Sequence, residues 1–253
     1  MADLRQALPD EGDLVVDLLQ RVYGGGGGGA FPRWVLSAAE TGFVLVSDVS
    51  IGAGIAFGQI GWIGGIGVTP ESRRRGLGAE VTSAVIDELR RRGCTTMLLL
   101  ATELGRPTYE RLGFVTECDY VVADRGPAEV PALPTVSPAS LAAAAGLDAW
   151  ATGSDRRAAL AAATGGIVED DGFVLQFPWT DRPVVASTPE TGLRLLEQAH
   201  PLRALVPEAN EPAVDWLGEN GYDVTLRYPR MRLGPALEWR PEALFGGLSL
   251  LTA

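Results

Sequence analysis

The pattern of apolar and polar positions predicts strands followed by helices in the first half of the chain. After the apolar helical run Leu14–Leu19, with Asp13 as its cap, three apolar stretches at 42–46, 51–60 and 62–68 predict consecutive strands, with turns at 48–50 and near Gly61. Frequent glycines in these strands indicate bulges or the close approach of a ligand backbone.

A strand, helix and strand then follow in succession. Residues 77–89 place apolar side chains at helical spacing, Gly93 ends that helix, and 95–101 predicts a buried strand. This succession predicts a βαβ-like crossover, and together with the preceding strands it indicates an α/β fold (α+β) with a mixed sheet.

The junction between the strand 62–68 and the helix 77–89 predicts an anion site. The first N–H groups of a helix have no partner within it, and the helix dipole adds positive potential at that end. Gly76 and Gly78 would let a phosphate approach these amides, and Arg73, Arg74 and Arg75 add charge. No Walker lysine and no third glycine of a dinucleotide fingerprint is present.

A second motif follows about 25 residues later. Residues 105–114 read Gly-Arg-Pro-Thr-Tyr-Glu-Arg-Leu-Gly-Phe, in which Pro107 suits the first turn of a helix and Gly113 suits its end. Phe114 then begins another strand.

The two motifs together resemble the GCN5-related N-acetyltransferase (GNAT) family. Arg73, Gly76 and Gly78 match its Arg/Gln-x-x-Gly-x-Gly/Ala pyrophosphate loop, and 109–114 matches its Tyr-Glu-x-Leu-Gly-Phe segment. The resemblance implies acetyl-CoA as cosubstrate, Tyr109 as the general acid for the departing thiolate and the Val68 N–H as an oxyanion donor. The cofactor-binding residues that it implies are Ile66, Gly67, Val68, Arg73, Arg74, Arg75, Gly76, Leu77, Gly78 and Ala79.

The general base is less evident from the sequence. The strand 62–68, where many family members place a glutamate, holds no carboxylate, so Glu103 after the next strand is the candidate, and a solvent-exposed loop acid is its alternative interpretation. Loop residues 169–171 and Trp179 of the second half are further candidates for lining the acceptor pocket.

The second half predicts a reduced copy of the first. A proline-rich linker at 127–137 separates an N-terminal acetyltransferase domain (1–126) from residues 138–236, and 237–253 form a tail. Gly172–Leu175 repeats the sequence of Gly42–Leu45. The link at 187–191, which corresponds to the phosphate loop, contains no glycine and no arginine, and Leu217 stands at the position that corresponds to Tyr109. This arrangement resembles the two-half, YitH-like acetyltransferases, whose second half is degenerate.

Composition narrows the partners. The net charge of −11 with no lysine argues against nucleic acid, and no apolar run is long enough for a membrane span, which together with the start of the chain predicts a cytoplasmic protein. Two cysteines and one histidine predict no metal site.

The acceptor and the assembly are open at this point. The leading hypothesis is acetyl transfer to the amine of a small molecule, by a monomer or a homodimer. The alternatives are a non-catalytic CoA-binding module, a hydroxyl acceptor and a longer acyl donor. The run Gly24–Gly29 predicts either a neutral insert or a loop that gates the substrate.

Overall fold

The chain forms two compact units. The computed structural model describes residues 3–24, 29–38, 40–179 and 182–249. Unit 1 comprises Met1–Val115 and Met231–Pro235, and unit 2 comprises Thr116–Arg230 and Ala236–Ala253. The boundary therefore falls about a strand earlier than the linker at 127–137, and the chain returns to unit 1 near its end. No helix in the described ranges is long and apolar enough to cross a membrane.

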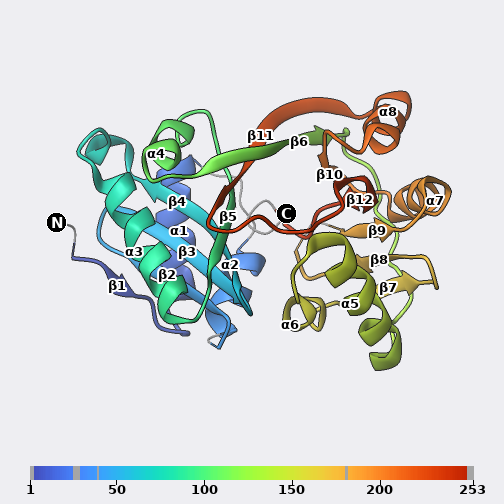
Figure 1. Ribbon diagram of the computed structural model, residues 1–253, viewed down its shortest axis with the longest axis horizontal. Helices are drawn as coiled ribbons and strands as arrows, with labels where there is room; N and C mark the ends of the chain where they lie inside the picture. Colours follow the sequence, from blue (N-terminus) through green and yellow to red (C-terminus); the bar gives the residue numbers. More distant parts are fainter. Residues whose placement is uncertain (1–2, 25–28, 39, 180–181, 250–253) are drawn as a thin grey trace. The chain divides into compact units, whose positions relative to one another are not determined.

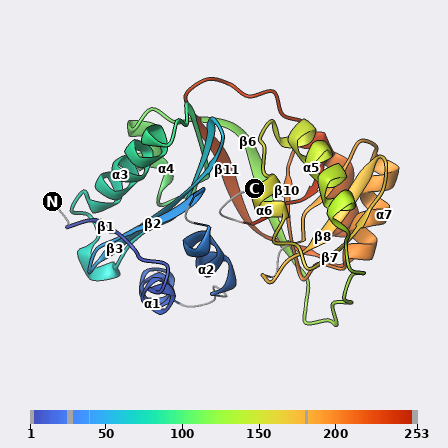
Figure 2. The ribbon, with the colours of Figure 1, turned by 90° about the horizontal axis from the view of Figure 1, so that it is seen from below.

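Unit 1 is a mixed sheet with helices on both faces (Figures 1 and 2). The hydrogen-bonded order of its strands is β1-β2-β3-β4-β5, with the end of β11 next to β5. Its elements are β1 (Arg5–Gln6), α1 (Gly12–Tyr23), α2 (Ala30–Ser37), β2 (Gly42–Val46), β3 (Ser50–Phe57), β4 (Ile60–Val68), the short 3₁₀ helix η1 (Pro70–Ser72), α3 (Leu77–Arg91), β5 (Thr96–Leu100) and α4 (Arg106–Arg111).

Amphipathic helices cover this sheet. Figure 2 shows α1 and α2 on one face and α3 and α4 on the other. On α3, Val81, Val85 and Leu89 are fully buried, as their helical spacing predicts, while charged side chains such as Asp87 and Arg90 face solvent. The burial of these apolar stripes holds the β4–α3 junction in place.

Two local predictions were wrong. Helix α1 begins at Gly12 after Glu11, and Asp13 lies in its first turn instead of capping it. The second hairpin turns at Gly58 and Gln59, not near Gly61, because Gly58 has a left-handed backbone (φ 63°) that a tight turn can use.

Unit 2 repeats the element order of unit 1. Its elements are β6 (Val115–Asp124), α5 (Pro138–Thr152), α6 (Arg157–Leu160), β7 (Gly165–Val168), β8 (Gly172–Gln176), β9 (Val184–Ala186), α7 (Pro189–Ala199), β10 (Arg203–Pro207), α8 (Glu211–Glu219), β11 (Asp223–Leu233), the 3₁₀ helix η2 (Pro241–Ala243) and β12 (Leu244–Gly246). Along the chain, apart from η1, the run from α1 to β6 and the run from α5 to β11 therefore share one order: two helices, three strands, a helix, a strand, a helix and a strand.

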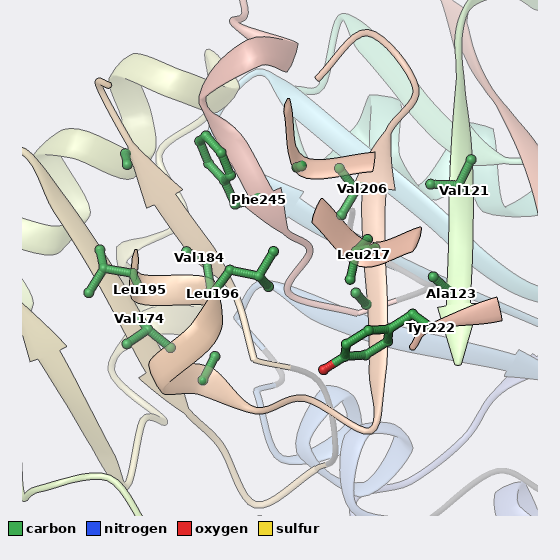
Figure 3. Packing of buried hydrophobic residues seen from close by; sticks show 14 residues of the cluster. Val121, Ala123, Val174, Val184, Leu195, Leu196, Val206, Leu217, Tyr222 and Phe245 are labelled. Atoms are coloured by element: carbon green, nitrogen blue, oxygen red, sulfur yellow. The ribbon is translucent and has the colours of Figure 1, made fainter. Parts of the chain in front are cut away.

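The core of unit 2 draws on seven of these elements. Figure 3 shows the cluster, with side chains from β6, β8, β9, α7, β10, α8 and β12. Residues 237–253 were predicted as a tail, but Phe245 of β12 is fully buried in this cluster. The prediction was wrong because the apolar segment Leu244-Phe245 forms a buried strand within these residues.

Candidate active site

The site is built around β4, which parts from β5 halfway along. The parallel ladder between the two strands covers Ile60 to Trp62, opposite Thr96 to Leu98, although β4 continues to Val68. We call residues 63–68 of β4 the open half of β4. The separation leaves backbone groups of this strand available to a ligand, as the family resemblance implied.

A bulge marks the open half. Ile51 faces Gly67 and Ala53 faces Gly64, so β4 holds one more residue than β3 between these pairs. Gly65 takes up the extra length with a left-handed backbone (φ 60°). The sequence predicts bulges among these glycines, and this one is confirmed.

Two other glycines in these strands leave space for the side chains of helices. A Cβ on Gly67 would lie 2.1 Å from Val22 Cγ1 of α1, and a Cβ on Gly61 would lie 2.8 Å from Leu89 Cδ1 of α3. At these two glycines, the groups that approach the strand closely are side chains of α1 and α3. The space of the side chain that Gly67 lacks is taken by Val22 of α1, and its predicted contact with the cofactor stays a prediction.

The direction of the backbone groups can be followed along the open half. The Thr69 N–H donates to Val49 O on the β3 side. Because successive residues of a strand point their backbone groups to opposite edges, the N–H and C=O of Val68 and Ile66 point away from β3. The Val68 N–H thus faces the open edge, where the predicted oxyanion donor is needed.

The carbonyls on this edge are bonded to side chains. Arg73 Nε donates to Val68 O at 3.1 Å, and Arg73 Nη2 donates to Val22 O at 2.8 Å. Arg73 therefore ties the last turn of α1 to the end of β4 and to the following loop. Its guanidinium was predicted to add charge for a phosphate, and the structure shows it engaged with two carbonyls.

The predicted phosphate loop leads directly into α3. Arg74 (φ 63°) and Gly76 (φ 83°) have left-handed backbones, and the first α-helical bond of α3 runs from the Glu80 N–H to Gly76 O. The amides of Leu77, Gly78 and Ala79 thus precede the first intrahelical bond. A Cβ on Gly76 or Gly78 would meet nothing within 4 Å, so the space before these amides is open.

Positive potential adds to this helix terminus. Arg74 and Arg75 are exposed beside it, and the dipole of the 15-residue helix α3 has its positive end there. Open amides, a dipole and two arginines form a cradle with the chemistry that phosphate groups require.

Tyr109 lies in α4 with its ring buried. The ring packs edge-on against Phe114 with centroids 5.9 Å apart, and burial followed by the electrostatic effect of Tyr23 raises the pKa of the phenol well above its usual range. The phenol therefore stays protonated at neutral and moderately alkaline pH and can donate a hydrogen bond.

Glu103 lies in the exposed turn before α4, and its role as a base stays a prediction.

Tyr23 was not identified from the sequence. It is the last residue of α1, and its Oη donates to Ile66 O on the open half at 2.8 Å. A lone tyrosine before a run of glycines carries no motif, and its contact with β4 spans 43 positions. The adjacent residues 25–28, which include most of the predicted gating loop, lie outside the described part of the chain.

Unit 2 holds its own C-terminal strand at the corresponding place. There, β9, α7 and β10 correspond in order to β4, α3 and β5. The strand β12 pairs with β9, Leu244 facing Val185, and the Gly247 N–H donates to Leu205 O of β10 at 2.8 Å. β12 thus bridges β9 and β10, where β4 and β5 of unit 1 separate.

The first turn of α7 is also occupied. A Cβ on Gly192 would lie 2.2 Å from the Phe245 ring, and Thr191 donates its hydroxyl to the Asp171 carboxylate at 2.6 Å. Thr188 caps the helix through the Thr191 N–H. The first turn of α7 thus has a side-chain cap and packs against Phe245 and Asp171 of unit 2 itself, whereas Gly76 and Gly78 of α3 have open space beside them.

Two further second-half candidates, Glu169 and Trp179, are engaged within unit 2. Glu169 forms an ion pair with Arg194, and Trp179 donates its Nε1–H to Leu248 O at 3.0 Å. Asp148 and Arg156 also form a buried bidentate ion pair (2.7 and 3.0 Å). These contacts account for the residues as parts of the unit 2 structure.

Comparison with known proteins agrees with this geometry. Residues 19–114 match the model of the acetyltransferase (GNAT) family. A proposed acetyltransferase from Pyrococcus horikoshii has 24% sequence identity and a TM-score of 0.83, covering 99% of this chain and 95% of its own. A GCN5-related N-acetyltransferase from Anabaena variabilis has 11% identity and a TM-score of 0.55, covering 92% of this chain and 72% of its own. No curated protein matches the chain. At these identities the two structures show a shared fold.

Proposed function

The chain carries an acyltransferase domain of the GNAT family at residues 19–114, and from this premise we propose that it transfers an acetyl group from acetyl-CoA to the amine of a small molecule. The observation that carries the proposal is the pairing of two features in unit 1. The open amides at the start of α3 suit a pyrophosphate. The loop before α3 joins this helix to Val68, the last residue of the open half of β4. A cofactor bound at the first would extend along the second.

Each group of the site has a task in this reaction. The thioester of acetyl-CoA supplies the activated acyl group. The amides of Leu77, Gly78 and Ala79 hold the pyrophosphate, and the Val68 N–H stabilises charge on the thioester oxygen. As the nitrogen bonds to the acyl carbon and the C–S bond breaks, Tyr109 donates its proton to the sulfur, and the proton that the nitrogen loses passes through solvent and restores the phenol. Burial keeps that phenol protonated and ready to donate.

The acidic composition supports a small acceptor over nucleic acid, because a chain with a net charge of −11 repels phosphate backbones. Acceptors with a hydroxyl group and longer acyl donors would use the same cradle and the same proton donor, so they are variants of this proposal. A module that binds CoA without turnover is the second candidate, and the absence of a carboxylate from 62–68 favours it.

We further propose that unit 2 is a degenerate copy of the acetyltransferase fold that binds no acetyl-CoA. Its repeated element order supports the common origin. β12 occupies the gap between β9 and β10, and Phe245 and Asp171 occupy the first turn of α7. A cofactor would have to displace a buried strand to bind there.

Calorimetric titration with acetyl-CoA tests both proposals. We expect saturable binding at one site per chain. Gly78→Glu should weaken binding by at least about tenfold, because a carboxylate placed among these amides repels the pyrophosphate. Gly78 has open space for a side chain and no left-handed backbone, so the substitution leaves the fold intact.

Two control variants separate charge from bulk. Gly78→Ala keeps the amides without adding charge and should bind as the wild type does. Gly146→Glu places the same carboxylate on α5 of unit 2, also in open space, and should have no effect. Two sites per chain would refute a degenerate unit 2, and the absence of binding would refute the transferase. Thiol release with a panel of small amines then distinguishes turnover from binding alone.

A further inference from the structure

The end of α1 is fixed against the open half of β4 by three contacts. Val22 fills the space left by the missing side chain of Gly67. Arg73 joins Val22 O to Val68 O. Tyr23 Oη donates to Ile66 O at 2.8 Å. Tyr23 is therefore held at the strand that the proposed reaction uses, although the residue itself is half exposed (53%).

The hydrogen bond to Ile66 decides what the Tyr23 hydroxyl can do. A phenol has one proton to donate and two lone pairs that accept. Since the proton of Tyr23 goes to Ile66 O, any further hydrogen bond at this oxygen is one that Tyr23 accepts. Tyr109 lies close enough to interact with Tyr23 electrostatically, and it keeps its own proton. One phenol of the site thus accepts while the other donates.

We infer that Tyr23 positions the attacking nucleophile by accepting a hydrogen bond from its N–H group. This inference rests on the proposed acyl transfer and extends it to the acceptor side. An amine that donates one N–H to Tyr23 Oη would be held beside the backbone of residues 66–68, where its lone pair can reach the acyl carbon. A phenol oxygen is a much weaker base than a carboxylate, so it cannot remove a proton from an ammonium group. The nucleophile that Tyr23 positions is therefore an amine that is already uncharged.

Hydroxylamine is a suitable probe because it is small, uncharged at neutral pH and carries the N–H groups that the inference requires. We would measure acetyl transfer to hydroxylamine by thiol release, and the affinity for acetyl-CoA by calorimetry. Tyr23→Phe should lower the hydroxylamine-dependent rate by about 3- to 10-fold, the value of one hydrogen bond, and leave the Kd for acetyl-CoA within about twofold. Tyr228→Phe removes a half-buried phenol from β11 and is the matched control.

The outcomes separate the inference from its premise. An unchanged rate in Tyr23→Phe would overturn it. A parallel loss of acetyl-CoA affinity would also overturn it, because Tyr23 would then only support β4. Wild-type protein that binds acetyl-CoA without transfer to hydroxylamine would refute nucleophile positioning while cofactor binding stands. Wild-type protein that binds no acetyl-CoA would refute the proposed function itself.

Discussion

Two tyrosines of unit 1 differ because of their surroundings. Tyr109 is packed in the core beside Phe114, and burial raises its pKa, whereas Tyr23 is half exposed and gives its proton to a backbone carbonyl. The same side chain is therefore proposed as a proton donor at one position and as a hydrogen-bond acceptor for the substrate at the other. At the scale of single residues, the surroundings of each hydroxyl determine its pKa and which hydrogen bonds it makes.

For the proposed acid, we expect Tyr109→Phe to lower kcat by about 100-fold or more, because general acid catalysis of this kind contributes that much. The ring stays, so the affinity for acetyl-CoA should not change. The pKa of Tyr109 is raised, so its proton is present at every pH below that raised value. Wild-type kcat/KM should accordingly show no loss due to Tyr109 near pH 10, the usual pKa of tyrosine. A falling limb near pH 10 that Tyr109→Phe abolishes would contradict the raised pKa.

At the scale of elements, the site depends on how closely α1 approaches β4. Because Gly67 has no side chain, Val22 packs directly against it, and Tyr23 and the carbonyl that Arg73 binds lie at the open half of the strand. Helix α1 thereby belongs to the site, although the motifs lie on the loop before α3 and on α4.

Gly67→Ala tests this packing. The new methyl would overlap Val22 Cγ1, and we expect a loss of about 1–3 kcal/mol in the free energy of unfolding, measured by urea denaturation. The double variant Gly67→Ala/Val22→Ala removes the overlapping group and should be more stable than the sum of the two single changes predicts. Strict additivity in this cycle would show that α1 does not approach Gly67 as closely as the structure places it.

At the scale of the molecule, the two halves of the chain share an order of elements but differ in what they leave open. Unit 1 leaves a strand and a helix N-terminus open, whereas unit 2 closes both with groups of its own. The last described residues of the chain are part of that closure, since the β12 strand lies between β9 and β10 and carries the buried Phe245.

Removing the Phe245 side chain should therefore destabilise the protein. We expect Phe245→Ala to cost about 3–5 kcal/mol, because it leaves a cavity in the unit 2 core. Leu104→Ala is the control, since Leu104 is 76% exposed and its loss should change stability by less than about 0.5 kcal/mol. Thermal denaturation followed by circular dichroism measures both. Equal melting temperatures for the two variants would restore the description of 237–253 as a tail.

The sequence alone determined what depends on neighbours along the chain. Apolar periodicity located β2, the β4–α3 junction and most of α3, and the left-handed Gly113 follows from its place at a helix end. Both motifs of the family lie within such local segments, so the residue pattern by itself predicts the phosphate loop and the role of Tyr109. Only the tertiary structure decided what depends on contacts between distant residues. It assigned Gly67 to helix packing, brought Tyr23 to Ile66 across 43 positions and placed β12 in the core of unit 2. Such contacts leave no periodic signal, because each is set by the packing of whole elements and not by the residues beside it in the chain.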